Sequence, residues 1–217
     1  MIRVYVICEG QTEETFIRDV IAPVLAPLQI FLTARLISTS KNNKGGALTY
    51  ERVRRFVLNC LKEHDDLVVT TFFDLYAVDT HFPDFAESQK QADVYQKVAV
   101  LEQAFKADVA SENTSFARRF LPYFQPYEFE GLLFADIAKL SAVESAWRIA
   151  TTRLLAIREG VQSPEHINDG YDTKPSAQLK KTFILTPIPQ NLTWPYRHRG
   201  DRHRYLIKRM PPFFGVV

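Results

Sequence analysis

Two acidic residues stand at the ends of apolar segments, where their side chains could hold a metal ion. Glu9 follows residues 2–7 and Asp74 follows residues 67–73, and both segments are predicted strands. Open parallel sheets bind ligands outside the carboxyl ends of their strands, so both carboxylates would face one crevice. Carboxylate oxygens suit Mg²⁺, which keeps several waters and takes one or two side chains plus substrate phosphate. The plainer alternative is that each acid only ends a strand in a polar turn.

A second group of acids lies in residues 127–134, Tyr-Glu-Phe-Glu-Gly-Leu-Leu-Phe. Glu128 stands at a predicted helix start among apolar neighbours, where an unpaired buried charge would be costly. A metal, a basic side chain or backbone donors could satisfy this carboxylate, and a structural cap explains it as well as a functional site does. Glu13 also has a plain explanation, because the helix dipole favours an acid in the first turn.

A third candidate lies in residues 166–176. Residues 168–170 (Asn-Asp-Gly) predict a turn. Lys174 could contact a phosphate, and Ser176 is predicted to cap the following helix. The sequence has no P-loop, no dinucleotide-binding glycine pattern, no His-Glu-x-x-His zinc motif and no recognisable Ser or Cys nucleophile. The acids are therefore the only chemistry that the sequence offers.

The elements that must position these residues alternate between strand and helix. The segment 2–7 is apolar without alternation, which is typical of a strand covered on both faces. Predicted strands cover residues 2–7, 30–37, 67–73 and 120–124, and predicted helices cover residues 13–24, 50–63, 87–109, 128–140 and 144–159. This order predicts an α/β fold with a mostly parallel central sheet and helices on both faces.

Local signals refine these elements. Thr12 is the predicted N-cap of the first helix, which Pro23 would shorten or kink. Pro122 favours an edge position for the last predicted strand. Residues 41–46 form a loop by composition.

The composition is typical of a globular protein of one domain, with 46% hydrophobic and 24% charged residues over 217 positions. No apolar run approaches the roughly 20 residues of a membrane helix, and residues 1–9 lack the pattern of a signal peptide. We therefore expect a cytoplasmic protein. Cys8 and Cys60 are expected to be buried thiols, because two cysteines alone cannot build a zinc site.

The charge of the chain is divided unevenly. Residues 173–217 hold nine Lys or Arg residues and one acid, a net charge of +8. Subtraction from the totals of 27 bases and 25 acids leaves 18 and 24, a net charge of −6, for residues 1–172. A basic end of this kind is typical of a nucleic-acid contact surface.

Four segments, in order, resemble the motifs of a known family. They are residues 6–13 (Val-Ile-Cys-Glu-Gly-Gln-Thr-Glu), 70–76 (Thr-Thr-Phe-Phe-Asp-Leu-Tyr), 126–134 (Pro-Tyr-Glu-Phe-Glu-Gly-Leu-Leu-Phe) and 167–176 (from Ile-Asn-Asp-Gly to Lys-Pro-Ser). The family is a TOPRIM-like bacterial one, domain of unknown function 4276 (DUF4276). The resemblance spans residues 2–181 and implies a TOPRIM/Rossmann-like domain over residues 1–181.

The resemblance also implies roles for the acids. TOPRIM enzymes use a glutamate after the first strand and aspartates after a later strand for Mg²⁺-dependent breaking or joining of phosphodiester bonds. By this resemblance, Glu9 would be a metal ligand or general acid/base, and Asp74 a metal ligand, for Mg²⁺ or Mn²⁺. Three further acids could complete the metal site: Glu13, Glu128 and Glu130.

Our leading hypothesis is a metal-dependent nuclease or related phosphodiester phosphoryl-transfer enzyme. Its catalytic residues would be Glu9, Asp74 and Lys174, with Lys174 binding the substrate phosphate. Relatives of the family resemble nuclease effectors of prokaryotic antiphage defence that work beside an AAA-type ATPase. The expected partners are therefore DNA or RNA and an AAA-type ATPase, and the apolar helices could support a homodimer.

Two departures from the family pattern favour alternatives. Tyr76 stands where TOPRIM enzymes carry a second aspartate, and the nearest later acid is Asp79. This departure favours a non-catalytic, TOPRIM-shaped binding or regulatory partner of an AAA-type ATPase. Residues 182–217 form a basic tail rich in Pro, Arg and aromatic residues. Our hypothesis for this tail is a shifted reading frame or a truncation, and a degraded gene product is the third alternative.

Overall fold

A computed structural model gives the fold of this chain over residues 1–37, 48–142, 145–167 and 172–184. The chain divides into two units, Met1–Gln125 and Pro126–Val217. The predicted loop over residues 41–46 and the predicted turn over residues 168–170 lie outside the described residues, as does the tail from residue 185 on. The expected domain over residues 1–181 stays a prediction.

A parallel β-sheet forms the centre of the first unit, as the order of elements predicted. Its strands are β1 (Ile2–Cys8), β2 (Ile30–Leu36), β3 (Leu67–Asp74), β4 (Phe120–Leu121) and β5 (Phe124–Gln125). The order across the sheet is β2-β1-β3-β4, with β5 also paired to β3, and every described pairing is parallel. β1 has a neighbouring strand on each side, and its carboxyl-terminal half is buried: Ile7 and Cys8 are completely buried.

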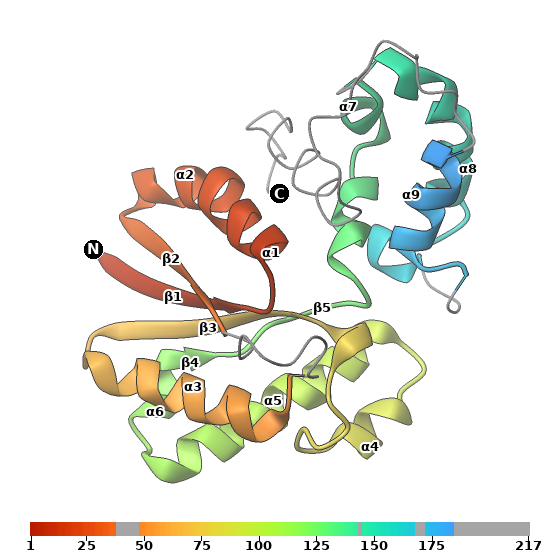
Figure 1. The fold of residues 1–217 in the computed structure, drawn as a ribbon. Helices are drawn as coiled ribbons and strands as arrows, with labels where there is room; N and C mark the ends of the chain where they lie inside the picture. The colour runs from red at the N-terminus through yellow and green to blue at the C-terminus, as the bar shows by residue number, and fades with distance from the viewer. Residues whose placement is uncertain (38–47, 143–144, 168–171, 185–217) are drawn as a thin grey trace, which may run out of the picture. The chain divides into compact units, whose positions relative to one another are not determined.

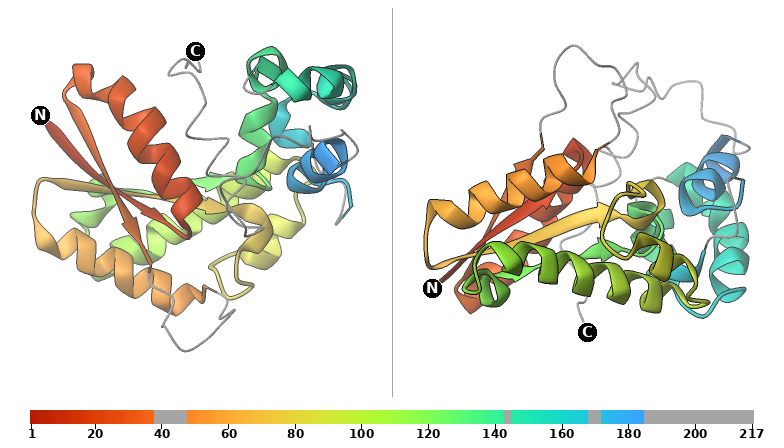
Figure 2. Two further views of the ribbon diagram at one scale, coloured as in Figure 1. Left: turned by 45° about the horizontal axis from the view of Figure 1, so that its top comes forward. Right: turned by 90° about the horizontal axis from the view of Figure 1, so that it is seen from below.

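Helices cover both faces of the sheet, which confirms the expected α/β fold (Figures 1 and 2). One face carries a helical run composed of α1 (Gln11–Phe16), a π turn (Ile17–Ile21), α2 (Ala22–Leu25) and a 3-10 turn (Ala26–Leu28). The other face carries α3 (Tyr50–Glu63), α5 (Val94–Glu112) and α6 (Phe116–Arg119). Arg54 of α3 pairs with Asp108 of α5 at 2.6 Å, which joins these two helices.

The first helix begins earlier than predicted. Gly10, in an extended conformation, is its N-cap, and Thr12 lies inside α1, so the prediction that Thr12 caps the helix is wrong. Pro23 does not end the helical run. The π turn precedes it, and there the N–H of Ala22 donates to the carbonyl of Ile17, five residues back. This wider turn accommodates the proline ring, which would clash with the carbonyl four residues back in a regular α-helix.

The single helix predicted over residues 87–109 is two helices, α4 (Phe85–Gln89) and α5. Asp93 separates them. Its carboxylate accepts hydrogen bonds from the N–H groups of Tyr95 at 2.9 Å and Gln96 at 3.2 Å, and so caps α5. With these two hydrogen bonds, a new helix begins after Asp93, where the apolar spacing alone predicted one continuous helix.

The strand predicted over residues 120–124 is divided into β4 and β5. Pro122 lies at the division, because it has no N–H to donate to a ladder. Thr71 of β3 bridges the gap, since its hydroxyl donates to the carbonyl of Tyr123 at 2.8 Å and accepts from the N–H of Tyr123 at 2.9 Å. This pair of bonds holds β5 against the end of β3.

Aromatic side chains fill the core between the sheet and α5. Phe105 is completely buried, and its ring centre lies 4.8 Å from that of Phe120, 5.3 Å from that of Phe82 and 5.6 Å from that of Tyr50. All three contacts are edge-to-face, a favoured geometry for aromatic pairs. The core of the first unit therefore depends heavily on one side chain of α5.

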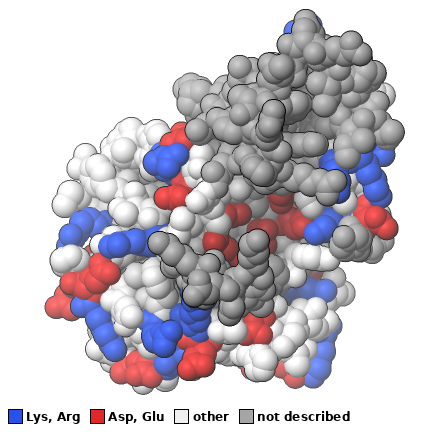
Figure 3. Space-filling model, viewed as in Figure 1, with Lys and Arg blue, Asp and Glu red and all other residues white. Residues whose placement is uncertain are grey.

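The surface of the first unit is mixed in charge, and its cysteines are buried. Basic and acidic side chains are mixed over the lower left of the face shown in Figure 3. Arg35 of β2 and Glu63 of α3 pair at 3.1 Å. Cys8 and Cys60 are both buried and unbridged, as predicted. Within the described ranges of the chain, no helix is long and apolar enough to cross a membrane.

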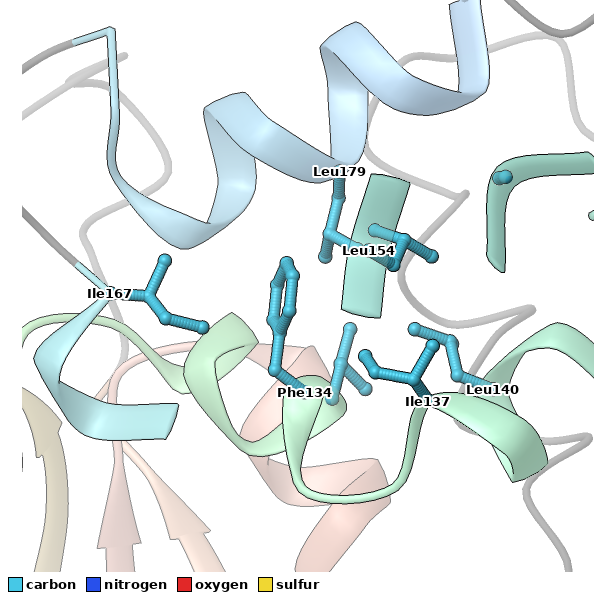
Figure 4. Packing of buried hydrophobic residues seen from close by; sticks show 8 residues of the cluster. Phe134, Ile137, Leu140, Leu154, Ile167 and Leu179 are labelled. Atoms are coloured by element: carbon cyan, nitrogen blue, oxygen red, sulfur yellow. The ribbon is translucent and has the colours of Figure 1, made fainter. Parts of the chain in front are cut away.

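The second unit is helical and has its own core. Its elements are η4 (Phe129–Phe134), α7 (Ile137–Ala142), η5 (Ser145–Ala150), α8 (Thr151–Glu159), η6 (Pro164–His166) and α9 (Pro175–Ile184), where η marks a 3-10 helix. The helices predicted over residues 128–140 and 144–159 are thus each a 3-10 helix followed by an α-helix. Side chains from η4, α7, α8 and α9 converge with Ile167 on one apolar cluster (Figure 4).

Candidate metal-binding site

The sheet topology brings Glu9 and Asp74 to the same edge. β1 lies between β2 and β3, so the chain leaves β1 toward one side of the sheet and leaves β3 toward the other. Such a reversal creates a crevice at the carboxyl ends of the two strands, the usual ligand site of open α/β sheets. Cys8 is paired with Phe72, so Glu9 directly follows the paired end of β1, and Asp74, the last residue of β3, lies two positions beyond Phe72. The sequence prediction that both acids lie at adjacent strand ends is confirmed.

The carboxyl group of Glu9 lies in a partly buried position that disfavours its charge. Burial, and then the nearby negative charge of Glu13, raise the pKa of Glu9 to about 7, against the opposing effect of a hydrogen bond from the backbone of Asp74. That hydrogen bond also shows that the Glu9 side chain reaches the end of β3. Burial and a like charge disfavour the ionised form of this carboxyl group, and a bound cation would favour that form.

Gly10 lets Glu13 lie close to Glu9. A Cβ atom at position 10 would come within 2.8 Å of Glu13 Oε2, so the carboxylate of Glu13 folds back over the glycine. Any larger residue would push this carboxylate away. The Glu-Gly pair therefore does more than end a strand, because it admits a second acid beside the first.

Asp74 is opposite Gln125 in the pairing of β3 with β5. Gln125 is completely buried, and its Oε1 accepts a hydrogen bond from the hydroxyl of Tyr123 at 2.9 Å. Its Nε2 has no hydrogen-bond partner among the described residues. This residue was missed by sequence analysis, because a glutamine at the end of a short strand has no motif of its own and its position depends on the β3–β5 register.

Neither Tyr76 nor Asp79 supplies the second aspartate of the TOPRIM pattern. Tyr76 is exposed in the 3-10 turn Leu75–Ala77. Asp79 is used elsewhere: its Oδ2 accepts from the backbone N–H of Tyr50 at 2.8 Å, and its Oδ1 lies 2.8 Å from the ring of His81. These bonds cap the start of α3, and the contact with His81 is the main cause that lowers the pKa of Asp79.

The donors present fit a hard divalent ion that keeps much of its water. Glu9 and Asp74 place two carboxylates at the ends of adjacent strands, and the charge of Glu13 acts on Glu9. Within residues 1–37, 48–142, 145–167 and 172–184, no group of three or more His, Cys, Asp or Glu side chains is already arranged to hold a metal. Mg²⁺ and Mn²⁺ sites of one or two carboxylates plus water and phosphate need no such group.

Glu128 and Lys174 lie together in the second unit. Glu128 is 6% exposed, and its two oxygens accept from Lys174 Nζ at 2.7 Å and from the backbone N–H of Ser176 at 3.1 Å. A basic side chain and a backbone donor thus satisfy the buried acid. Ser176 is the second residue of α9, so the prediction that its side chain caps this helix is wrong, and the cap comes from Glu128. Metal binding by Glu128 and Glu130, and phosphate binding by Lys174, stay predictions.

Lys174→Met is expected to lower the free energy of unfolding of the second unit by about 1–3 kcal/mol, because it leaves Glu128 buried with one donor fewer. Urea unfolding followed by circular dichroism measures the effect. Lys181→Met is the matched control, since Lys181 forms an exposed ion pair with Asp172 at 3.7 Å and its loss should cost little. Equal losses in the two variants would contradict a structural role for Lys174.

An acidic pair at the switch point of a parallel sheet defines this chain as an α/β protein with a candidate metal site. The family described as a domain of unknown function (DUF4276) matches residues 8–191, so the chain belongs to that family. The matched range includes Glu9, Asp74, Glu128 and Lys174, and residues 192–217 lie outside it. Searches of curated proteins and of solved structures gave no match.

Proposed function

We propose that this chain is a metal-dependent enzyme that cleaves phosphodiester bonds in nucleic acid. One observation carries the proposal: Glu9 and Asp74 lie at the carboxyl ends of two adjacent parallel strands, at the switch point of the sheet. Mg²⁺ or Mn²⁺ would be held there by these two carboxylates. Such an ion polarises a phosphoryl oxygen and lowers the pKa of an attacking water.

The residues of the chain would divide the remaining work. Asp74 is a fixed ligand at the end of β3. Glu9 has a pKa of about 7, so it either binds the ion after losing its proton or exchanges a proton with the reacting oxygens. Glu13 adds negative charge beside Glu9, which strengthens the attraction for a cation. Binding of the substrate phosphate by Lys174, a residue of the second unit, is an expectation from the sequence that the proposal keeps.

The wider setting is part of the same proposal. The resemblance of the four motifs to TOPRIM enzymes supports a nuclease of that type, with DNA or RNA as substrate. The likeness of the family's relatives to antiphage effectors supports a role in prokaryotic defence, in the cytoplasm, beside an AAA-type ATPase. A homodimer and a nucleic-acid contact by the basic tail belong to the proposal as well.

A second candidate is a non-catalytic, TOPRIM-shaped partner of such an ATPase. The observation in its favour is the exposed Tyr76 at the position of the second aspartate, with Asp79 engaged in capping α3. A site of this kind would bind a metal ion without turnover.

Cleavage assays on the purified full chain separate the two candidates. Labelled single-stranded DNA, double-stranded DNA and RNA are incubated with Mg²⁺, Mn²⁺ or a chelator. We expect cleavage with metal, none with the chelator, and none by Asp74→Asn. Asp66→Asn is the matched control, because Asp66 is exposed before the start of β3, where its carboxylate pairs with Arg3 at 2.6 Å. This variant should remain active. Metal binding without cleavage of any of these substrates would favour the non-catalytic partner.

A further inference from the structure

A buried amide group lies beside the candidate metal site with one of its two ends unused. Gln125 has no exposed surface, and its Nε2 has no hydrogen-bond partner among the described residues. Buried amide donors are nearly always paired, because an unpaired one loses its bonds to water without replacement. A donor of this kind indicates a partner that the protein's own side chains do not supply in this state.

The alternation of β5 shows which way this amide faces. Phe124 packs toward α5, since its ring lies 6.5 Å from that of Phe105. Tyr123 is on the opposite face, where its ring stacks on Phe72 at 5.5 Å. Gln125 follows Phe124 in β5, so its side chain points to the face opposite Phe124, and there its Oε1 accepts from the hydroxyl of Tyr123. By the same rule Asp74 shares the face of Phe72.

The register then places Gln125 next to Asp74. The two residues are directly paired across β3 and β5, and adjacent strands lie about 4.8 Å apart. A glutamine side chain that points to the same face as its partner aspartate can therefore reach the carboxylate. Among the described residues, Gln125 Nε2 is a buried donor without a partner at the position paired with Asp74.

Tyr123 fixes which end of the amide faces the acids. Its hydroxyl donates to Gln125 Oε1, so the amide oxygen is occupied and the two N–H bonds of Nε2 remain. The reverse orientation would leave an unpaired oxygen lone pair close to Asp74, Glu9 and their negative charges, which is electrostatically unfavourable. The hydroxyl and the charge of the site thus favour the same orientation.

We propose that Gln125 is a positioning residue for Asp74: its Nε2–H donates to the carboxylate of Asp74 and orients it for binding a divalent ion, while Tyr123 orients Gln125. The inference rests on the proposed metal site at Glu9 and Asp74. Carboxylates that bind metals are themselves hydrogen-bonded, and loss of such an outer contact typically weakens metal binding or activity about 10- to 100-fold. A neutral amide suits this task because a lysine or arginine would neutralise the carboxylate and compete with the ion.

Calorimetric titration of the full chain with Mn²⁺ tests the proposal, alongside thermal melting of the metal-free protein. Gln125→Met keeps the size of the side chain and removes the donor. It should weaken Mn²⁺ binding about 10- to 100-fold and leave the melting temperature unchanged or higher, because an unpaired buried donor is removed. Gln96→Met, on α5, is the control and should match the wild type in both measurements. Wild-type affinity in Gln125→Met, or a large fall in its melting temperature, would overturn the proposal.

Tyr123→Phe is the second variant, and the ring it retains is partly exposed. It frees the amide to rotate, so Mn²⁺ binding should weaken by about threefold to tenfold, less than in Gln125→Met. If the amide oxygen itself bound the ion, loss of the competing hydroxyl would strengthen binding, and this result would also overturn the proposal. A wild-type protein that binds no Mn²⁺ would refute the metal site itself. If the wild type and Gln125→Met both bind Mn²⁺ normally, the metal site stands and only the role of Gln125 is refuted.

Discussion

Glu9→Gln is expected to reduce metal-dependent cleavage at least about 100-fold and, at the same time, to stabilise the metal-free protein above about pH 7. Burial and the charge of Glu13 raise the pKa of Glu9 to about 7 in the folded protein, whereas an unfolded glutamate titrates near its ordinary value of about 4.3. The folded state therefore binds the proton more tightly than the unfolded state does.

The sign of the pH dependence follows from this difference. Below about pH 4 both states carry the proton, and glutamine resembles the protonated acid, so the variant and the wild type should be equally stable. As the pH rises toward 7, wild-type stability falls, because Glu9 loses its proton in the unfolded state but keeps it in the folded state. At higher pH the folded state must instead bury the charge of the ionised carboxylate. Above about pH 7 the variant should be more stable by about 1–3 kcal/mol.

Urea unfolding in the presence of a chelator, at about pH 5 and about pH 8, measures this effect. Glu14→Gln is the matched control, because it removes an acid from the same turn of α1 and should show a smaller difference between the two pH values. A Glu9→Gln protein that is less stable than the wild type at about pH 8 would contradict the burial and charge environment described for Glu9. Unchanged cleavage would remove Glu9 from the mechanism.

Phe105→Ala is expected to lower the free energy of unfolding of the first unit by about 3–5 kcal/mol. The side chain is completely buried and contacts the rings of Phe82, Phe120 and Tyr50. Truncation leaves a cavity that these neighbours would have to close, and aromatic pairs contribute beyond the area that they bury. Circular dichroism in urea gives the midpoint and slope from which this loss is obtained.

Tyr95→Ala is the control for Phe105→Ala, because Tyr95 lies on the same helix and is 45% exposed. Its substitution should cost less than about 1 kcal/mol. If both variants lost similar unfolding free energy, the loss would come from substituting alanine in α5 and not from the core. This result would contradict the central position of Phe105 in the core.

The part of the site that follows from strand order could be predicted from the sequence. Glu9 and Asp74 each end an apolar run, and parallel topology alone brings such ends together. What could not be predicted depends on register or on distant contacts. Gln125 meets Asp74 only because Thr71 bridges the break at Pro122 and holds β5 in place. The partner of Glu128, Lys174, is 46 positions away in the chain.

The errors in the predicted helices have a different cause. Apolar residues recur at helical spacing on both sides of Asp93, so this periodicity does not reveal that a new helix begins there. Thr12 is a good cap by residue type, yet Gly10 takes the position because the chain leaves β1 in an extended conformation and turns at once. Local propensity decides such boundaries only where no neighbouring strand has already fixed the path of the backbone.

The central claim is that Glu9 and Asp74 share one divalent ion, and the most direct measurement is the calorimetric titration of wild type and Asp74→Asn with Mn²⁺. We expect the wild type to bind a single ion per chain at this site and Asp74→Asn to bind it at least about 100-fold more weakly. Mn²⁺ binding of equal affinity and stoichiometry in both proteins would contradict the claim.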